Sequence, residues 1–598
     1  MSETQLSIIP FGGVRENGKN MFAVTVDDEI FILDAGLKYP ETDLLGVDVV
    51  VPDFSYLIAN IDKVAGIFLT HGHADSIGAL PYFLQQAKVP IFGSPLTIEL
   101  AKLAIKSVDE LSDFDDFHVV NAESKVDFGK TSISFFSTTH SIPQSLGIVV
   151  ETQYGQVVYT GDFKFDPTAK LEYQTDFGRL TDIARKGVVA LMADVNGVET
   201  PGQSVSESVI DEYIFNLFRH YKQKRIVVAL VASNVIRIQQ IINAAFENGR
   251  KVALAGNDLE NIVKTAIEMG KIILPAEENK IFTDVKNVKS LNPNEAVILV
   301  AGKMGEPIRH LQKMASGQDR DVQIADTDLV FIATTPSISA ESIMARTRDL
   351  LYRRGADVKA IKDDLRSSGH ASQADLQLLM NILKPKFFFP TQGEYRVMTA
   401  ADYLAQEIGI KKDQIFLMMR GDQYKYVDDQ FVLSESFKVT ETMIDGAGFN
   451  DVGDVVLRDR RLLANDGVFV LVIAIDRKKK TIVTEPKITS RGFVFTDPDL
   501  IKKASEVATV QIKEYLNKAK DFDWNDLKNG VRDEVSKFIS DQTRRRPAVM
   551  PVIMEVNQNR RPSAKKKPET NSGKQANNPK PNNEPRPKPA PKKDAENG

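Results

Sequence analysis

Two histidines and an aspartate near residue 70 are spaced so that they could bind a metal ion. The segment reads His71-Gly-His73-Ala-Asp75, and it follows an apolar run, residues 64–69, that is typical of a buried strand. Imidazole nitrogens and carboxylate oxygens are common ligands of divalent metals. A hydrolase with two metal ions would need a further histidine at position 76, where this chain has Ser76. The segment therefore predicts a metal site and raises the question of whether it holds one ion or two.

Two later strands are predicted to bring further ligands to the same place. The apolar runs 132–136 and 157–160 are followed by His140 and Asp162. Ligands at the ends of several strands would converge at one edge of a sheet, and rigid elements of this kind make a dense metal site. Asp34, which ends another apolar run, is the predicted supporting acid, because a carboxylate behind a ligand can orient it.

Composition limits the other chemistry that the chain could perform. It has 598 residues, seven histidines and no cysteine, so a metal must be held by His, Asp or Glu. His118, His220 and His310 lie outside the ligand-bearing motifs and are interpreted as ordinary residues. A hydrophobic content of 42% with 26% charged residues is typical of several globular domains. No run approaches the roughly 18 apolar residues of a membrane span, and the first residues do not resemble a secretion signal, so no membrane contact and a cytoplasmic location are expected.

The last 39 residues differ sharply from the rest of the chain. Residues 560–598 carry eleven Lys or Arg, four Asp or Glu and eight prolines, but no aromatic or branched aliphatic residue. Such a segment cannot bury enough apolar surface to fold, so we predict a disordered basic tail. It is either an arm that touches RNA or another polyanion, or a solubilising tail with no dedicated partner.

The order of predicted elements divides the folded part into regions. The first 200 residues alternate short strands with turns and helical stretches, whereas residues 205–350 show longer helices between strands, as in a parallel α/β sheet inserted into the chain. Residues 356–450 return to short strands and glycine turns. The region near 461–555 is predicted to be a small α/β domain, with strands 468–475, 481–483 and 549–556 and helices 501–519 and 524–543.

These motifs together resemble the metallo-β-lactamase fold, and the inserted region, flanked by Asp194 and His370, resembles its β-CASP subgroup. Phrases along residues 1–556 are similar to the ribonuclease J family in particular. They are Phe11-Gly-Gly-Val-Arg-Glu-Asn17-Gly, Thr139-His-Ser-Ile-Pro143, Thr160-Gly-Asp-Phe-Lys-Phe-Asp166, Gly393-Glu-Tyr-Arg396, Val455-Val-Leu-Arg-Asp-Arg-Arg461, Ser490-Arg-Gly-Phe493 and Arg544-Arg-Arg-Pro547.

The resemblance implies an α/β architecture, a metallo-β-lactamase αββα sandwich with an inserted β-CASP domain and a small C-terminal α/β domain. The expected boundaries are 1–205 and 356–450 for the two parts of the metallo-β-lactamase domain, 206–355 for the β-CASP domain, 451–462 for a linker, 463–557 for a C-terminal oligomerisation domain and 558–598 for the tail.

The resemblance also assigns metal ligands. His71, His73 and His140 would hold one metal, with Asp162 bridging to a second that Asp75 would help to bind. At two further positions the family has histidine ligands, and this chain has Ser76 and Gln392 instead. This pattern resembles the catalytically degenerate second paralogue of the family.

The substitutions lead to a prediction about each metal. The three imidazoles and one carboxylate suit a single Zn²⁺. The remaining oxygen ligands of the other site suit Mn²⁺ or Mg²⁺, bound weakly, because two direct nitrogen ligands are missing.

The resemblance places catalytic and substrate-binding groups around these metals. Asp75, Asp162 and His370 would be catalytic, and His370 could donate a proton to the leaving oxygen. Arg366, Ser367, Ser368 and Gly369 would bind RNA phosphate beside His370. The alternative for residues 367–370 is an ordinary glycine turn with no ligand.

For the whole chain, the resemblance implies RNA processing and decay by a ribonuclease. The family is a 5′-to-3′ exonuclease on 5′-monophosphorylated RNA with some endonuclease activity, and we expect this chain to be weakly active. The alternative is a non-catalytic structural or RNA-binding partner of an active ribonuclease J paralogue, in a hetero-oligomer, with homodimers also expected through the C-terminal domain. A small-molecule lactamase or thioesterase is disfavoured, because the inserted domain would have no use there.

Overall fold

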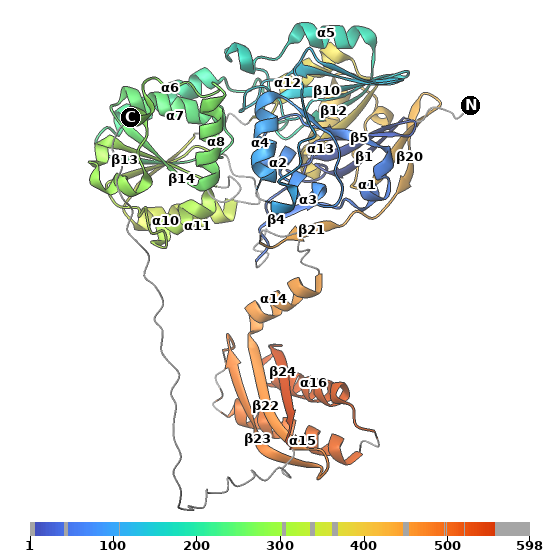
Figure 1. The fold of residues 1–598 in the computed structure, drawn as a ribbon, viewed down its shortest axis with the longest axis vertical. Helices are drawn as coiled ribbons and strands as arrows, with labels where there is room; N and C mark the ends of the chain where they lie inside the picture. The colour runs from blue at the N-terminus through green and yellow to red at the C-terminus, as the bar shows by residue number, and fades with distance from the viewer. Residues whose placement is uncertain are drawn as a thin grey trace, which may run out of the picture. The chain divides into compact units, whose positions relative to one another are not determined.

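The protein contains two compact units in the computed structural model, Met1–Arg458 and Asp459–Gly598, which are described separately (Figure 1). The structure describes residues 6–40, 46–106, 108–301, 307–334, 341–361, 369–446, 454–494, 497, 499–518 and 521–556. Among these residues, no helix combines the length and the apolar character needed to cross a membrane. The tail beyond residue 556 lies outside the described residues.

Two sheets of the first unit pack face to face. The first has the strand order β20-β19-β1-β2-β3-β5-β6-β7. Its strands are β1 (Leu6–Gly12), β2 (Met21–Val26), β3 (Glu29–Leu33), β5 (Val64–Phe68), β6 (Ile91–Gly93), β7 (Phe117–Val119), β19 (Asp422–Val427) and β20 (Gln430–Ser436). The second has the order β18-β12-β11-β10-β9-β8. Its strands are β8 (Lys125–Phe128), β9 (Thr131–Ser137), β10 (Leu146–Thr152), β11 (Gly155–Tyr159), β12 (Val188–Asp194) and β18 (Phe387–Thr391).

Strand alternation explains this packing. Successive side chains of a strand point to opposite faces, and Phe31 and Phe68 belong to the core between the two sheets while their neighbours Ile32 and Ile67 pack under the outer helices. Across the sandwich, the rings of Phe22 and Tyr159 lie 5.4 Å apart. Full burial of one such aromatic side chain contributes about 1.5–3 kcal/mol.

Helices cover the outer faces of both sheets (Figure 1). The first group consists of α1 (Ser55–Ala59), α2 (Ala74–Ile77), α3 (Leu80–Leu84) and α4 (Pro95–Ile105). The second consists of α5 (Phe177–Lys186), α12 (Gln373–Leu383) and α13 (Tyr395–Glu407). A short sheet pairs β4 (Val49–Pro52) with β21 (Glu441–Ile444). This is the predicted αββα sandwich.

A five-stranded parallel sheet forms the inserted domain, in the order β14-β15-β13-β16-β17. The strands are β13 (Arg225–Ala229), β14 (Lys251–Ala255), β15 (Ala296–Val300), β16 (Asp328–Ile332) and β17 (Asp357–Ala360). One face carries α6 (Glu207–His220), α7 (Val235–Glu247) and α8 (Asn257–Glu268), and the other carries α10 (Ile308–Ser316) and α11 (Glu341–Arg353) (Figure 1). The short helix α9 spans Glu278–Ile281. Helices on both faces are what a parallel sheet requires.

The second unit is a three-stranded sheet covered on one face by two helices (Figure 1). Its strands are β22 (Val468–Asp476), β23 (Thr481–Arg491) and β24 (Ala548–Glu555), and its helices are α15 (Leu500–Lys518) and α16 (Trp524–Thr543). The helix α14 (Asp454–Asp466) contains most of the residues predicted to be a linker.

Two expectations about secondary structure were wrong. The predicted strand 481–483 is the long strand β23, which continues through Pro486. Since β23 is an edge strand, the missing N–H of proline does not interrupt a sheet pairing on both sides. The region 356–450 was expected to hold short strands and turns, yet it contains the helices α12 and α13.

Candidate metal centre

Several strand ends meet at one edge of the sandwich and carry the predicted ligands there. β11, β12 and β18 run parallel side by side, with Tyr159 opposite Met192 and Asp194 opposite Thr391. The residues that follow or end these strands, Asp162, Asp194 and Gln392, therefore reach the same edge. The loops after β5 and β9 bring the histidines to the same edge from the two sheets.

Four predicted ligands form one cluster, in which all but the half-buried His73 are buried. Ligand atoms of His71, His73, His140 and Asp162 all lie within 4.8 Å of one another. Asp162 Oδ2 is 3.7 Å from both His71 Nε2 and His140 Nε2. His140 Nε2 also lies 3.1 Å from His73 Nδ1. Three imidazoles and a carboxylate at these separations form a donor set suited to Zn²⁺.

Unpartnered atoms in this cluster support a metal ligand set. Among the described residues, His71 Nε2 and Asp162 Oδ1 are buried and have no hydrogen-bond partner. Buried polar atoms are nearly always hydrogen-bonded, so unpartnered atoms within one cluster of ligand side chains are expected where an ion binds. The residues present therefore fit a metal.

Neighbouring groups orient the histidine ligands. His140 Nδ1 donates to the Gly369 carbonyl at 2.8 Å, which leaves Nε2 to face the cluster. A Cβ at residue 369 would lie only 2.3 Å from the His140 ring, so glycine is required there. Thr70 Oγ1 lies 2.9 Å from His71 Nδ1 and donates to Asp34. Asp34 thus acts on His71 through Thr70, as a supporting acid.

Asp34 is itself held in an unusual position. Its φ is +59°, and it is completely buried. It accepts hydrogen bonds from the Thr70 amide at 2.8 Å and from the Tyr159 hydroxyl at 2.9 Å. Burial raises the pKa of Asp34 to about 7, although the hydrogen bonds from Thr70 and Tyr159 act in the opposite direction.

The positions of the expected second metal are also buried. Ser76 and Gln392 are 0% and 1% exposed. Ser76 Oγ, Gln392 Oε1 and Asp75 Oδ1 are buried and have no hydrogen-bond partner within the part of the chain that the structure describes. Gln392 has a φ of +58°. Its side-chain nitrogen Nε2 donates to the Tyr159 hydroxyl at 3.4 Å. Asp75 Oδ1 approaches His71 Nε2 to 3.8 Å. This half of the centre offers only oxygen atoms from these three side chains.

His370 lies beside the cluster in a second acidic group. His370 Nδ1 is 2.6 Å from Asp194 Oδ2 and 3.9 Å from Asp162 Oδ2. Burial disfavours the charged imidazole, but the carboxylates of Asp194 and Asp162 outweigh this effect and raise the pKa of His370 to about 10. His370 therefore carries a proton near neutral pH, as a proton donor requires.

Burial determines the charge of the ligands themselves. It lowers the pKa of His71 and His140, and lowers that of His73 to about 4, because the cation is disfavoured in a dry site. Burial also raises the pKa of Asp162, and the nearby charge of Asp75 raises it further. The pKa of Asp75 rises to about 6, again chiefly through burial. Neutral imidazoles are the form that binds metal.

The remaining predicted phosphate-binding residues and the other histidines are not part of this cluster as the structure describes it. Arg366, Ser367 and Ser368 lie outside the described residues. His118 pairs with Asp116 at 2.8 Å and His310 with Asp319 at 3.1 Å, away from the cluster. Thr70 and Tyr159, which link Asp34 to both halves of the centre, were missed in the sequence. Their positions at the ends of two ligand-bearing strands were the available signal.

The fold and this cluster define a metallo-hydrolase of the metallo-β-lactamase class with an inserted domain. Residues 14–193 match the model of the metallo-beta-lactamase superfamily, and residues 355–414 match the Zn-dependent metallo-hydrolase RNA specificity domain. Residues 223–349 match the ribonuclease J beta-CASP domain, and residues 455–556 match the ribonuclease J C-terminal domain.

Curated relatives identify the family. The chain is 47% identical over 555 residues to Ribonuclease J 2 of Streptococcus pyogenes, covering 92% of this chain and 100% of the relative. It is 40% identical to the proteins of the same name from Staphylococcus epidermidis and Staphylococcus aureus, over 92% of this chain and 98% of each relative. The chain belongs to the ribonuclease J family.

Proposed function

We propose that this chain is a metal-dependent ribonuclease of the ribonuclease J type that is weakly active because half of its metal centre has lost its nitrogen ligands. The substrate class is RNA in processing and decay, with 5′-to-3′ action on 5′-monophosphorylated ends and some internal cleavage. One observation carries the proposal: the three-histidine cluster is complete, whereas the buried side-chain oxygens of Ser76 and Gln392 have no partner among the residues that the structure describes. The cytoplasmic location expected from the sequence remains a prediction.

His71, His73, His140 and Asp162 would hold one Zn²⁺. A bound metal would supply positive charge that polarises the phosphodiester and its attacking water. Asp75 and Asp162 would offer only a weak oxygen site for Mn²⁺ or Mg²⁺, since even loss of an outer-shell partner costs about 10–100-fold in metal affinity or activity. The second position is therefore expected to be mostly empty at ordinary metal concentrations.

The protein's own groups provide the remaining chemistry. His370, held by Asp194, would donate its proton to the oxygen that leaves when the phosphodiester breaks. Gly369 orients His140 through its carbonyl while its amide would face the phosphate. Arg366, Ser367 and Ser368 are proposed to bind phosphate beside them.

A second candidate function is a structural or RNA-binding partner of an active ribonuclease J paralogue. It is favoured by the C-terminal unit, in which Met550, Val552 and Met554 of β24 are 48%, 43% and 50% exposed. Val552 pairs with Val472 of β22, which is also exposed, so apolar residues continue across the open face of the sheet. Exposed apolar patches of this kind mark protein interfaces, and this face would join either two copies of the chain or the chain and its paralogue.

Restoring the two missing histidines tests the proposal directly. Ser76→His with Gln392→His should increase the bound metal from one ion per chain to two, and should raise the rate on a 5′-monophosphorylated RNA by at least about tenfold, because two ions can clamp both oxygens of the reacting phosphate. Elemental analysis and a single-turnover assay provide the measurements.

The matched control is Ser76→Ala with Gln392→Ala, which changes the same positions without adding nitrogen. It should leave the zinc content and the rate as they are. Two tightly bound ions and full activity in the unaltered chain would refute the proposal. One ion and no activity in the restored variant would favour the structural candidate.

A further inference from the structure

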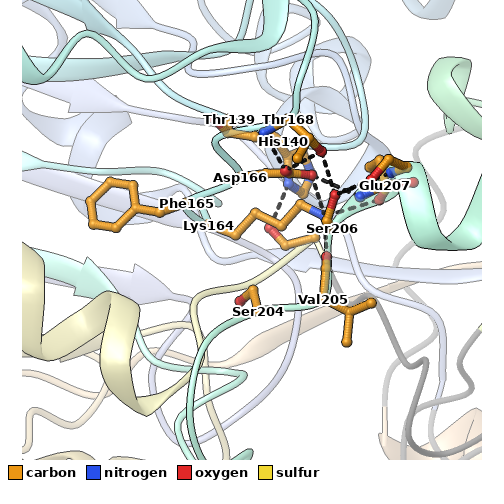
Figure 2. A network of polar contacts seen from close by, with 12 residues as sticks. Thr139, His140, Lys164, Phe165, Asp166, Thr168, Ser204, Val205, Ser206 and Glu207 are labelled. Carbon is orange, nitrogen blue, oxygen red and sulfur yellow. Dashed lines mark hydrogen bonds and ion pairs between the residues drawn. The ribbon is translucent and has the colours of Figure 1, made fainter.

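A buried network of charged side chains joins the metal-bearing sandwich to the inserted domain. Lys164, two residues after Asp162, is 1% exposed, and its ammonium lies 2.9 Å from Glu207 Oε1 (Figure 2). It also donates to the Val205 carbonyl at 3.3 Å. Glu207 is the first residue of α6, where the chain enters the inserted domain. The network therefore stands at the crossing point between the two domains.

Glu207 is held from both sides. From the sandwich, Asp166 accepts a hydrogen bond from the Glu207 amide at 2.8 Å. From α7 of the inserted domain, Arg237 Nη2 lies 3.2 Å from Glu207 Oε2, and Gln240 donates to the same carboxylate oxygen at 3.3 Å. Arg237 is 2% exposed. The position of α6 and α7 is thus tied to the loop that carries Asp162.

The same network reaches the loop of His140. The Lys164 amide donates to the Thr139 carbonyl at 2.9 Å, and the Ile236 amide of α7 donates to the Ser141 carbonyl at 3.2 Å. Thr139 is labelled beside this group in Figure 2, and His140 follows it in the chain. Both neighbours of His140 are therefore bonded to the network or to the helix that it anchors.

Stability alone does not account for such a network. Buried ion pairs lose so much hydration that apolar residues of similar size often stabilise a protein as well or better. What charged groups with fixed partners add is a defined geometry. Here that geometry concerns two loops that each carry a predicted metal ligand.

We propose that Lys164 is a positioning residue which, through Glu207 and Arg237, sets His140 and Asp162 against the inserted domain. The inference rests on the proposed metal function and extends it: the placement of the inserted domain determines the affinity and geometry of the metal centre. Glu207 is not a metal ligand and begins the inserted domain. A substitution of Glu207 must then change the metal affinity and the coordination geometry.

The test compares Lys164→Met and Glu207→Gln with the native full-length chain. Zn²⁺ affinity is measured by competition with a chelator, and Co²⁺ is loaded in place of Zn²⁺ so that visible absorption reports the coordination geometry. Both variants should bind Zn²⁺ at least about tenfold more weakly, the scale known for groups that orient metal ligands, and both should show an altered Co²⁺ spectrum. Lys164→Arg, which keeps the charge, should restore part of the affinity.

Arg225→Met is the matched control. Arg225 makes a partly buried ion pair with Asp328 at 2.6 Å inside the same inserted domain, between neighbouring strands of its sheet. Its loss should lower the thermal stability as the test variants do, yet leave the Zn²⁺ affinity and the Co²⁺ spectrum unchanged. This separates positioning from a general loss of stability.

Failure of the inference and failure of the proposed function give different results. If Lys164→Met and Glu207→Gln keep the native affinity and spectrum, or if Arg225→Met changes them equally, the inference is overturned. If a single variant does not fold, the double variant K164M/E207Q, which removes one charge of each sign, replaces it with the same expectation. A native chain that binds no metal at all would instead refute the proposed function and is recognised before any variant is compared.

Discussion

The two halves of the metal centre share one scaffold but differ in their ligands. In the first half, His71 and His140 each have a partner that fixes the ring, Thr70 and the Gly369 carbonyl. In the second half, Ser76 and Gln392 are equally buried, yet their oxygen atoms have no partner among the described residues. The buried scaffold is thus present in both halves, whereas histidine ligands are present only in the first.

The loss of chemistry that we propose for the second half would therefore leave the architecture of the site in place. Asp34 contacts Thr70, which serves the first half, and Tyr159, which lies beside Gln392 in the second. Removing Asp34 would therefore harm the intact half, and the buried acid stays although only one half is expected to hold a metal. The backbone at Gln392 keeps a φ of +58°, a conformation that is uncommon outside glycine.

The largest expected effect comes from deleting a ligand of the intact half. His140→Ala removes one of four metal ligands and should weaken Zn²⁺ binding by more than the roughly 100-fold upper range for outer-shell changes. Chelator competition measures the affinity. Gln392→Ala is the control from the other half and should leave Zn²⁺ affinity unchanged. Equal losses in both variants would mean that the two halves hold metal together, and the comparison would fail.

A smaller effect is expected for the shared support. Asp34→Asn keeps the residue shape and tolerates the positive φ, but it exchanges a carboxylate oxygen for an amide that cannot accept from both Thr70 and Tyr159. Zn²⁺ affinity should fall by about tenfold through poorer orientation of His71. Thermal unfolding of the metal-free chain serves as the companion measurement. If the Zn²⁺ affinity is unchanged while the thermal stability of the metal-free chain falls, Asp34 contributes to folding and does not orient His71.

Much of this centre could be predicted because strand patterns are local. The apolar runs before His71, His140 and Asp162 placed each ligand at a strand end. The order of elements indicated the inserted parallel α/β region, whereas the αββα sandwich followed from the resemblance to the metallo-β-lactamase fold. Asp34 was predicted as a supporting acid, but its partner could not be predicted in this way, since Asp34 and Thr70 are 36 residues apart. The same holds for Lys164 and Glu207, which are 43 residues apart. Only tertiary packing decides which distant side chains meet.

One error was avoidable. Leu376, Leu379, Met380 and Leu383 are all buried on α12 at helical spacing, and this period is visible in the sequence. The glycines in the same region favour turns between short strands, which is the interpretation that was wrong. The long strand β23 was harder to predict, because its proline normally argues against a strand and only its edge position makes it acceptable.

The smallest effect concerns a single hydroxyl in the second half. Ser76 is completely buried on α2, and its Oγ has no hydrogen-bond partner among the described residues. A buried polar group without a partner costs about 1–3 kcal/mol, and alanine is the better helix former. Ser76→Ala should therefore raise the free energy of unfolding of the metal-free chain by about 1 kcal/mol in urea titrations.

Ser134→Ala provides the matched comparison for that measurement. Ser134 is also completely buried, but its hydroxyl donates to Glu151 Oε1 at 2.9 Å, so its removal should lower the free energy of unfolding by about 1 kcal/mol. Changes of opposite sign in the free energy of unfolding would mean that the Ser76 hydroxyl has neither water nor an ion as a partner. A loss of stability in both would mean that Ser76 does hold a partner, water or an ion, and that the second half still binds something.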